Sequence, residues 1–376
     1  MSTITRIEIT HHRLPLDPPF PASWDTVPRT HFPATIVRVF DDAGRCGIGS
    51  GDSMYGFSDY QKYFIGQDPT NIDRHAAVLS NIEFHAGRPW PLDLALWDLN
   101  GKIKGEPVWK MLGGFSNKIR AYASSGVHRP IADMVTVARQ ARDLGFPALK
   151  VRFGRPKLDD DDLAVVKAIR DDLGSSLELM VDCNQGWRMP WDIAAPWTVD
   201  HATAVAKVLE ENGVYWMEEP LHRGDYDGMT ELHNRVKIRI AGGELTREPY
   251  EFRELLQRGC FDVFQPDVVC TQGITGLAKF AHEVAAAGKI FTPHTWGTGI
   301  GVMGNLHVTA GTVGAPFIEF PFDPPEWTTE RRDYMLTNTI EADGEGWIHL
   351  SDEPGLGITL NEEVLQQTAS AQATFS

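Results

Sequence analysis

Six short motifs decide the fold of this chain: VDCNQ (181–185), WMEEP (216–220), AGGE (241–244), QPDVV (265–269), TPHTW (292–296) and IEF (318–320). Each motif lies at the end of a short β-type run, and two further runs, KIRAYAS (118–124) and PALKVRF (147–153), precede them. Segments with helical periodicity, such as DDLAVVKAIRDDL (161–173), separate the runs. Eight runs alternating with helices over residues 118–321 predict a (β/α) barrel, with an open doubly wound sheet as the competing architecture.

The composition narrows the class of protein. The 35 Lys and Arg against 51 Asp and Glu give a formal net charge of −16, which disfavours nucleic acid and anionic membranes as partners because both need a basic face. No apolar run is long enough to span a membrane, and the first residues read as a strand, so we expect a cytoplasmic protein. The 4 cysteines form no C-x-x-C pair, which fits free thiols in a reducing compartment.

The regions on either side of the predicted barrel have a different sequence pattern. Residues 1–117 begin with two alternating segments, ITRIEIT (4–10) and ATIVRVF (34–40), and continue into helical patterns. Residues 322–376 return to turns and strands, as in TIEADGEGWIHLSD (339–352). We expect these two regions to form one α+β capping domain on a catalytic barrel of residues 118–321.

Ionisable or amide side chains stand at the ends of the barrel runs. In chain order they are Lys150, Arg152, Asp182, Asn184, Glu218, Glu244, Asp267, His294 and Glu319. A single carboxylate in such a place more often caps the following helix. Because barrel enzymes build their active sites at the carboxyl ends of the strands, the whole ordered set predicts one shared site.

The residue types in this set indicate a reaction. Asp182, Glu218 and Glu244 would bring three carboxylates together, which requires a cation, and all-oxygen ligands favour magnesium over zinc. Asp267 beside His294 would orient the imidazole as a base.

The remaining polar residues would serve the substrate. Glu319, if burial keeps it protonated, could donate a hydrogen bond to a developing oxyanion. Lys150 and Arg152 lie two residues apart on one strand, so they share a face and could hold a carboxylate. Together these features predict that His294 removes the α-proton of a small carboxylate substrate, while magnesium, Lys150 and protonated Glu319 stabilise the enolate that results.

These motifs resemble the enolase superfamily, and within it the mandelate racemase subgroup. LALWDLNGKIKGEPVWKMLGG (94–114) is similar to the signature that precedes the barrel in this family. The resemblance covers essentially the whole chain and implies a modified (β/α)7β barrel of the TIM type with an α+β cap. It also implies Mg²⁺ held by Asp182, Glu218 and Glu244, a His294–Asp267 dyad, and Glu319 as the electrophilic acid.

One departure from the family pattern bears on the reaction. Racemising members carry K-x-K on the second barrel strand, whereas this chain has Lys150-Val151-Arg152. Arginine is a poor proton acceptor, so the second face of the substrate lacks an obvious base. We therefore expect an acid-sugar dehydratase that gives a 2-keto-3-deoxy acid, with a racemase or epimerase of a 2-hydroxy acid as the alternative.

The resemblance also suggests which residues meet the substrate. Cap loops near residues 15–30 and 50–65 would close over the barrel, and neighbouring copies in a homo-oligomer would complete the site. Arg152, Asn184 and Trp296 are candidate substrate-binding residues. Asn184 stands where some relatives carry a histidine, which argues against the galactonate and mannonate dehydratase patterns.

Two readings from other functional classes compete with this one. Residues 299–304 match G-x-G-x-x-G, and Glu319 follows 20 residues after Gly299, as in an NAD-dependent oxidoreductase. Five residues separate this motif from the preceding run, so close helix packing explains the glycines better. A catalytically silent relative that only binds its ligand is the second alternative, because Arg152 permits it.

Overall fold

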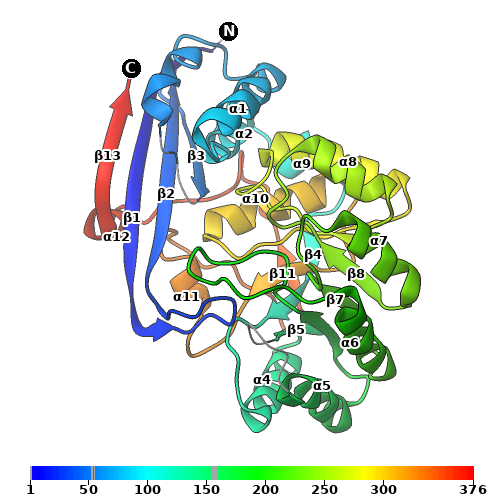
Figure 1. The fold of residues 1–376 in the computed structure, drawn as a ribbon. Helices are drawn as coiled ribbons and strands as arrows, with labels where there is room; N and C mark the ends of the chain where they lie inside the picture. Colours follow the sequence, from blue (N-terminus) through cyan, green and yellow to red (C-terminus); the bar gives the residue numbers. More distant parts are fainter. Residues whose placement is uncertain (1, 52–53, 55, 154–159) are drawn as a thin grey trace.

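The computed structural model describes residues 2–51, 54, 56–153 and 160–376. Its centre is a curled parallel sheet whose strands follow the order β10-β9-β8-β7-β6-β5-β4-β11 (Figure 1). The strands are β4 (Lys118–Ser124), β5 (Ala148–Arg152), β6 (Glu178–Asp182), β7 (Trp216–Glu218), β8 (Arg239–Gly242), β9 (Val263–Phe264), β10 (Ile290–Phe291) and β11 (Ile318–Pro321).

One helix follows each of the first seven of these strands and packs on the outside of the sheet (Figure 1). The helices are α4 (Ile131–Asp143), α5 (Asp160–Leu173), α6 (Val199–Glu211), α7 (Tyr226–Arg235), α8 (Pro249–Gln257), α9 (Gly273–Ala286) and α10 (Gly299–Gly311). Side-chain hydrogen bonds join the segment that follows β10 to the start of β11: Thr292 Oγ1 donates to Phe317 O at 3.4 Å, and Thr295 Oγ1 donates to Glu319 O at 2.7 Å. The predicted (β/α)7β barrel is confirmed, and the open doubly wound sheet is not.

A layer of apolar side chains closes the barrel interior below the site. Its members come from six successive strands: Tyr122, Ala148, Met180, Trp216, Ala241 and Val263. Because side chains alternate along a strand, the inward residues two and four positions after Ala148 are Lys150 and Arg152. The same alternation points Asp182 and Glu218 inward, because each lies two residues beyond a member of the layer, Met180 or Trp216, on the same strand.

The cap is built around an antiparallel sheet of order β13-β1-β2-β3, at the left of Figure 1. Its strands are β1 (Ile4–Phe20), β2 (Arg29–Asp41), β3 (Cys46–Gly51) and β13 (Ala369–Phe375). Helices α1 (Ile72–Ala86) and α2 (Pro91–Lys104) pack on it through an apolar cluster that includes Ile7, Val39 and Leu96. Short 3-10 turns occupy Phe57–Asp59 and Gln61–Tyr63.

The C-terminal tail contacts both parts of the molecule. Strand β13 pairs with β1 in the cap, whereas β12 (Trp347–His349) pairs antiparallel with β4 of the barrel. Short helices α3 (Val108–Met111), α11 (Thr329–Arg332) and α12 (Glu362–Thr368) complete the connections. Within the described ranges, no helix is long and apolar enough to cross a bilayer.

The glycine-rich segment 299–304 forms the first turns of α10. A Cβ added to Gly299 would lie 2.3 Å from Asp333 Oδ1, and one on Gly304 would lie 3.0 Å from a methyl group of Val268. These glycines therefore let α10 approach its neighbours closely. Their role is helix packing and not phosphate binding.

Candidate active site

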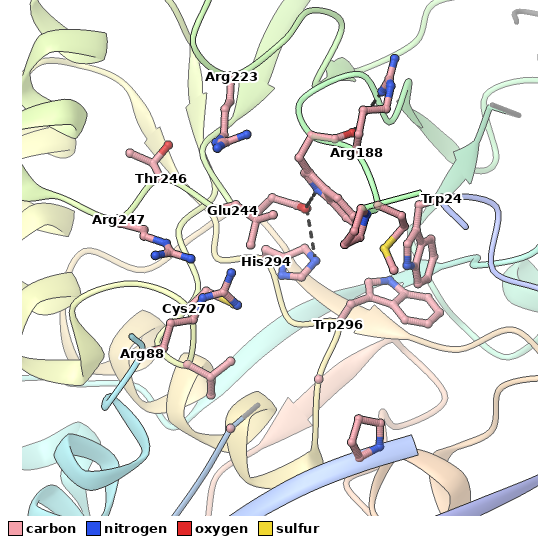
Figure 2. Close-up of a pocket in the computed structure, with 18 of the residues that line it drawn as sticks. Trp24, Arg88, Arg188, Arg223, Glu244, Thr246, Arg247, Cys270, His294 and Trp296 are labelled. Atoms are coloured by element: carbon pink, nitrogen blue, oxygen red, sulfur yellow. Dashed lines mark hydrogen bonds and ion pairs between the residues drawn. The ribbon is translucent and has the colours of Figure 1, made fainter. Parts of the chain in front are cut away.

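A cavity of about 760 Å³ lies over the carboxyl ends of the barrel strands, under the cap. Four of the residues predicted from sequence line it: Arg152, Glu244, His294 and Trp296. Figure 2 shows Glu244 and His294 side by side at its centre, with Trp24 and Trp296 on one side. The other predicted ionisable residues are buried beneath this surface.

The candidate metal ligands lie at the ends of the adjacent strands β6 and β7 and just beyond β8. Each is engaged by a basic side chain in this structure. Lys150 Nζ lies 2.7 Å from Glu218 Oε1, and Arg152 Nη1 lies 2.5 Å from Asp182 Oδ2. The third carboxylate, Glu244, faces His294 Nε2 at 3.3 Å.

The donor set fits a hard divalent cation, because it is all oxygen and carries excess negative charge. Burial raises the pKa of Glu218 to about 7; Lys150 opposes the rise, and Asp182 and Glu319 add to it. As the side chains stand, no three potential ligands among the described residues converge on one point. Ligation therefore requires the carboxylates to turn from their basic partners toward a common centre.

The predicted dyad is present as a hydrogen-bonded pair. His294 Nδ1 lies 3.0 Å from Asp267 Oδ2, which leaves Nε2 directed toward Glu244 and the cavity. Burial by itself lowers the pKa of His294, but the carboxylates of Glu244, Glu319 and Asp267 outweigh it and raise the pKa to about 10. The imidazole is therefore cationic at neutral pH while Glu244 is its partner.

Asn305, on α10, holds the dyad from behind, and sequence reasoning missed it. Its Nδ2 donates to Asp267 Oδ1 at 2.9 Å and to His294 O at 3.0 Å. Its Oδ1 accepts from Val268 N at 3.1 Å, and the side chain is fully buried. The available signal was Asn305 itself, one of two polar side chains, with His307, inside the mainly apolar GIGVMGNLHV (299–308).

The expectation that burial keeps Glu319 protonated is wrong for this arrangement. Burial alone raises the pKa of Glu319, but Lys150, His294 and Arg152 outweigh it and hold the pKa well below its usual value. The carboxylate accepts from Ser124 Oγ and from Thr295 N, each at 2.7 Å. Glu319 is thus an ionised partner of Lys150, whose Nζ lies 2.8 Å away.

Arg152 is fixed in place from several directions. Besides its contact with Asp182, its Nε donates to Ser125 O at 2.8 Å. Its guanidinium carbon lies 4.7 Å from the ring centre of Trp24 and 5.2 Å from that of Trp296. Arg152 therefore connects a metal-ligand candidate to the cap loop that carries Trp24.

Asn184 departs from its predicted role at the substrate. Its backbone is left-handed with φ of 52°, and it is not among the residues that line the cavity. Its N–H donates to Asp182 Oδ1 at 2.8 Å, and its Nδ2 donates to Phe153 O at 3.3 Å. Asn184 supports the turn after β6 and orients Asp182.

Both predicted cap loops reach the cavity. The segment 15–30 contributes four lining residues and the second loop contributes Gly51, whereas residues 52, 53 and 55 lie outside the described ones. Sequence reasoning missed a basic group of lining residues, namely Arg88, Arg188, Arg223 and Arg247. They lie in loops distant in sequence, so no local motif marks them.

Known proteins similar to this chain fall in one family. The family model described as Enolase C-terminal domain-like matches residues 133–364. Arabinonate dehydratase of Saccharolobus solfataricus is 30% identical over 279 residues, which cover 73% of this chain and 70% of that enzyme. D-galactarolactone cycloisomerase of Agrobacterium fabrum is 29% identical over 387 residues, covering 97% and 98% of the two chains.

Solved structures agree over the whole length. L-talarate dehydratase of a Polaromonas species, with magnesium and L-glucarate bound, superposes with a TM-score of 0.85 at 26% identity and covers 100% of both chains. A racemase of Streptomyces coelicolor with bound magnesium superposes with a TM-score of 0.83 at 27% identity, covering 98% of this chain and 100% of that one. A barrel with carboxylates on successive strand ends, a His–Asp pair and these relatives place the chain in the enolase superfamily, among its mandelate racemase-like members.

Proposed function

We propose that this protein is a magnesium-dependent acid-sugar dehydratase. The observation that carries the proposal is that His294 directs Nε2 toward the cavity, where it can exchange a proton, whereas the other ionisable residues of the predicted set that line the cavity are the metal-ligand candidate Glu244 and Arg152. Arg152, on the other side, is held by Asp182 and by a backbone carbonyl. Relatives named as dehydratases support the same reaction class.

Asp182, Glu218 and Glu244 are the residues that would hold Mg²⁺. The ion would supply a Lewis acid that neutralises the charge developing on the substrate carboxylate. If Glu244 were to ligate the ion, His294 would lose the strongest of the charges that raise its pKa, and burial would lower that pKa. Such a change would make His294 a better base.

The reaction then needs only one proton-transfer group. Nε2 of His294 takes the α-proton, and the electrons of that C–H bond move onto the substrate carboxylate as an enolate, which then forms the carbon–carbon double bond and expels the β-hydroxyl. The imidazolium returns its proton to the departing oxygen, so water is released and the resulting enol becomes a 2-keto-3-deoxy acid. Asp267 stabilises the imidazolium.

Lys150 keeps the enolate-stabilising role that it was expected to share with a protonated Glu319. Burial lowers the pKa of Lys150, but Glu218 and Glu319 outweigh this and raise it, so the ammonium group stays charged. A buried cation next to the metal-ligand candidates stabilises negative charge on the substrate carboxylate as the proton leaves.

Cycloisomerisation is the second candidate, because two of the relatives bear that name and one covers 97% of this chain. The same proton removal could expel a ring oxygen in place of hydroxide.

The test is a screen with Mg²⁺ in which hexonates, pentonates, aldarates and their lactones are offered and the 2-keto product is trapped with semicarbazide. His294→Asn should abolish product formation, while His282→Asn, at an exposed position on α9, should not. If the enzyme inverts the α-carbon without releasing water, the protein is a racemase and the proposal fails.

A further inference from the structure

The turn that carries Asp267 leads directly into α9. Asp267 O accepts the N–H groups of Cys270 and Thr271 at 3.0 and 2.8 Å. Its Oδ1 accepts the N–H of Val269 at 3.1 Å. These bonds close one helical turn around Asp267, and α9 begins two residues after Thr271, at Gly273. Whatever fixes the start of α9 therefore also fixes the carboxylate of the dyad.

A buried hydroxyl group ties this turn to the loop that carries Glu244. Thr271 Oγ1 donates to Thr246 O at 2.6 Å, and Thr271 is fully buried. Thr246 lines the cavity two residues after Glu244, and its N–H donates to Gly243 O at 3.2 Å, which closes a turn around Glu244. The Thr271 hydroxyl thus joins the segment with the dyad carboxylate to the segment with a metal-ligand candidate.

The first turn of α9 is held by the cap. Helix α2 of the cap lies against α9, and Asp93 on α2 is fully buried where the two helices meet (Figure 1). Its Oδ1 accepts Thr275 Oγ1 at 2.7 Å, and its Oδ2 accepts Thr275 N at 3.1 Å. A Cβ added to Gly273 would lie 2.3 Å from Asp93 Oδ2, so the glycine leaves room for the carboxylate. Asp93 therefore caps α9 from across the junction between cap and barrel.

This contact is reinforced by a tryptophan and by charge. Trp97, one turn after Asp93 on α2, donates its Nε1–H to Thr275 Oγ1 at 2.8 Å. Burial raises the pKa of Asp93 to about 6, against the hydrogen bonds from Thr275, so the carboxylate is ionised at pH 8 and its charge favours the N-terminus of α9. Undocking the cap would leave this carboxylate and the first N–H groups of α9 without each other, so the cap and the start of α9 hold one another in place.

We propose that Asp93 and Thr271 are positioning residues, which hold the turn of Asp267 at a fixed place relative to the loop of Glu244 when the cap is docked. The cap thereby acts on the dyad and on a metal-ligand candidate through the backbone, besides covering the cavity. The inference rests on the proposed function, which assigns Asp267 and Glu244 their roles. Changes at either positioning residue should alter Mg²⁺ affinity and turnover together, although neither side chain lines the cavity.

The first test removes the Thr271 hydroxyl, at pH 8. Thr271→Val is nearly isosteric and should lower Mg²⁺ affinity by about 10-fold in calorimetry, and kcat by about 10-fold on the best substrate of the screen, the loss that is typical for groups that orient a metal site. KM should stay close to the parent value, because the cavity wall is unchanged. Thr271→Ser keeps the hydroxyl and should restore both quantities. The control Thr203→Val, on α6, removes a buried hydroxyl that donates to Val199 O at 2.7 Å and should change neither.

The second test acts from the cap. Asp93→Asn keeps the size of the side chain but removes its charge, and it should lower Mg²⁺ affinity and kcat in the same sense as Thr271→Val. Because both changes act through one turn, the double variant should lose less than the product of the two single effects. Asp98→Asn is the matched control: Asp98 is equally buried on α2 but accepts the N–H groups of Ile48 and Leu356, at 2.8 and 2.7 Å. It should lose stability and keep Mg²⁺ affinity.

The outcomes separate this inference from the proposed function. If Thr271→Val and Asp93→Asn unfold at lower urea concentration but bind Mg²⁺ and turn over as the parent does, the two residues are only structural and the inference is overturned. Single effects that multiply fully in the double variant would also overturn it, because the residues would then act independently. Weakened Mg²⁺ binding in both variants of a parent that dehydrates no acid in the screen would leave the positioning role standing and overturn the proposed function.

Discussion

Asn305→Leu should separate catalysis from substrate binding, because Asn305 touches the dyad but does not line the cavity. The change removes three hydrogen bonds of 2.9, 3.0 and 3.1 Å from a fully buried site of similar volume. At about 1 kcal/mol for each bond, the free energy of unfolding should fall by about 3 kcal/mol. Loss of the group that orients Asp267 should lower kcat by about 10- to 100-fold.

The assay combines urea unfolding with steady-state kinetics on the best substrate of the screen. KM and Mg²⁺ affinity should stay close to the parent values, because the carboxylates and the cavity wall are untouched. Asn100→Leu is the matched control: Asn100 is equally buried on α2 and donates to Pro69 O and Leu96 O at 2.7 and 2.8 Å, far from the dyad. It should lose stability and keep kcat.

Two results would refute this reasoning. If Asn305→Leu retains the parent kcat, the orientation of Asp267 does not depend on Asn305. If Asn100→Leu loses as much kcat as Asn305→Leu, the effect is general destabilisation. The isosteric Asn305→Asp, which sets a carboxylate oxygen against Asp267, should reduce kcat further than leucine does.

Acid should destabilise the fold, because burial lowers the pKa of His307 to about 4, whereas the unfolded chain takes up this proton near 6.5. The free energy of unfolding should therefore drop by about 3 kcal/mol as pH falls from 7 to 4 in urea titrations, and His307→Gln should flatten this slope. Magnesium should bind about tenfold more tightly at pH 8 than at pH 6 by calorimetry, since the ligand Glu218 has a pKa of about 7 and must ionise; Glu218→Gln should remove the dependence. In D₂O, unreacted substrate should gain deuterium at the α-carbon without inversion, because Arg152 cannot deliver a proton to the second face; inverted substrate seen by NMR would contradict this.

The strand–helix alternation and the residues at the strand ends were readable from sequence. Asp182 and Glu218 are the last residues of their strands. The two-residue period of a strand brings them to the same face as Met180 and Trp216. Parallel strands need both faces covered, which a barrel and a doubly wound sheet both achieve, and the ordered ionisable residues at the strand ends favoured the barrel. The order of the ionisable residues along the chain thus predicted their order around the barrel.

Only the tertiary structure decided how these charges pair and what surrounds them. Whether Glu319 is neutral or ionised depends on the distances to Lys150 and Arg152, and electrostatic energies at such short range are not encoded in any local motif. Asn305 lies on α10 and Arg88 in the cap, so only the packing of α10 and the closure of the cap over the barrel bring them to the site. Sequence by itself determined the fold and pointed to the candidate site residues. The curling of the barrel, which brings charges distant in the chain against one another, decided how they pair, and the docking of the cap supplied the other wall of the cavity.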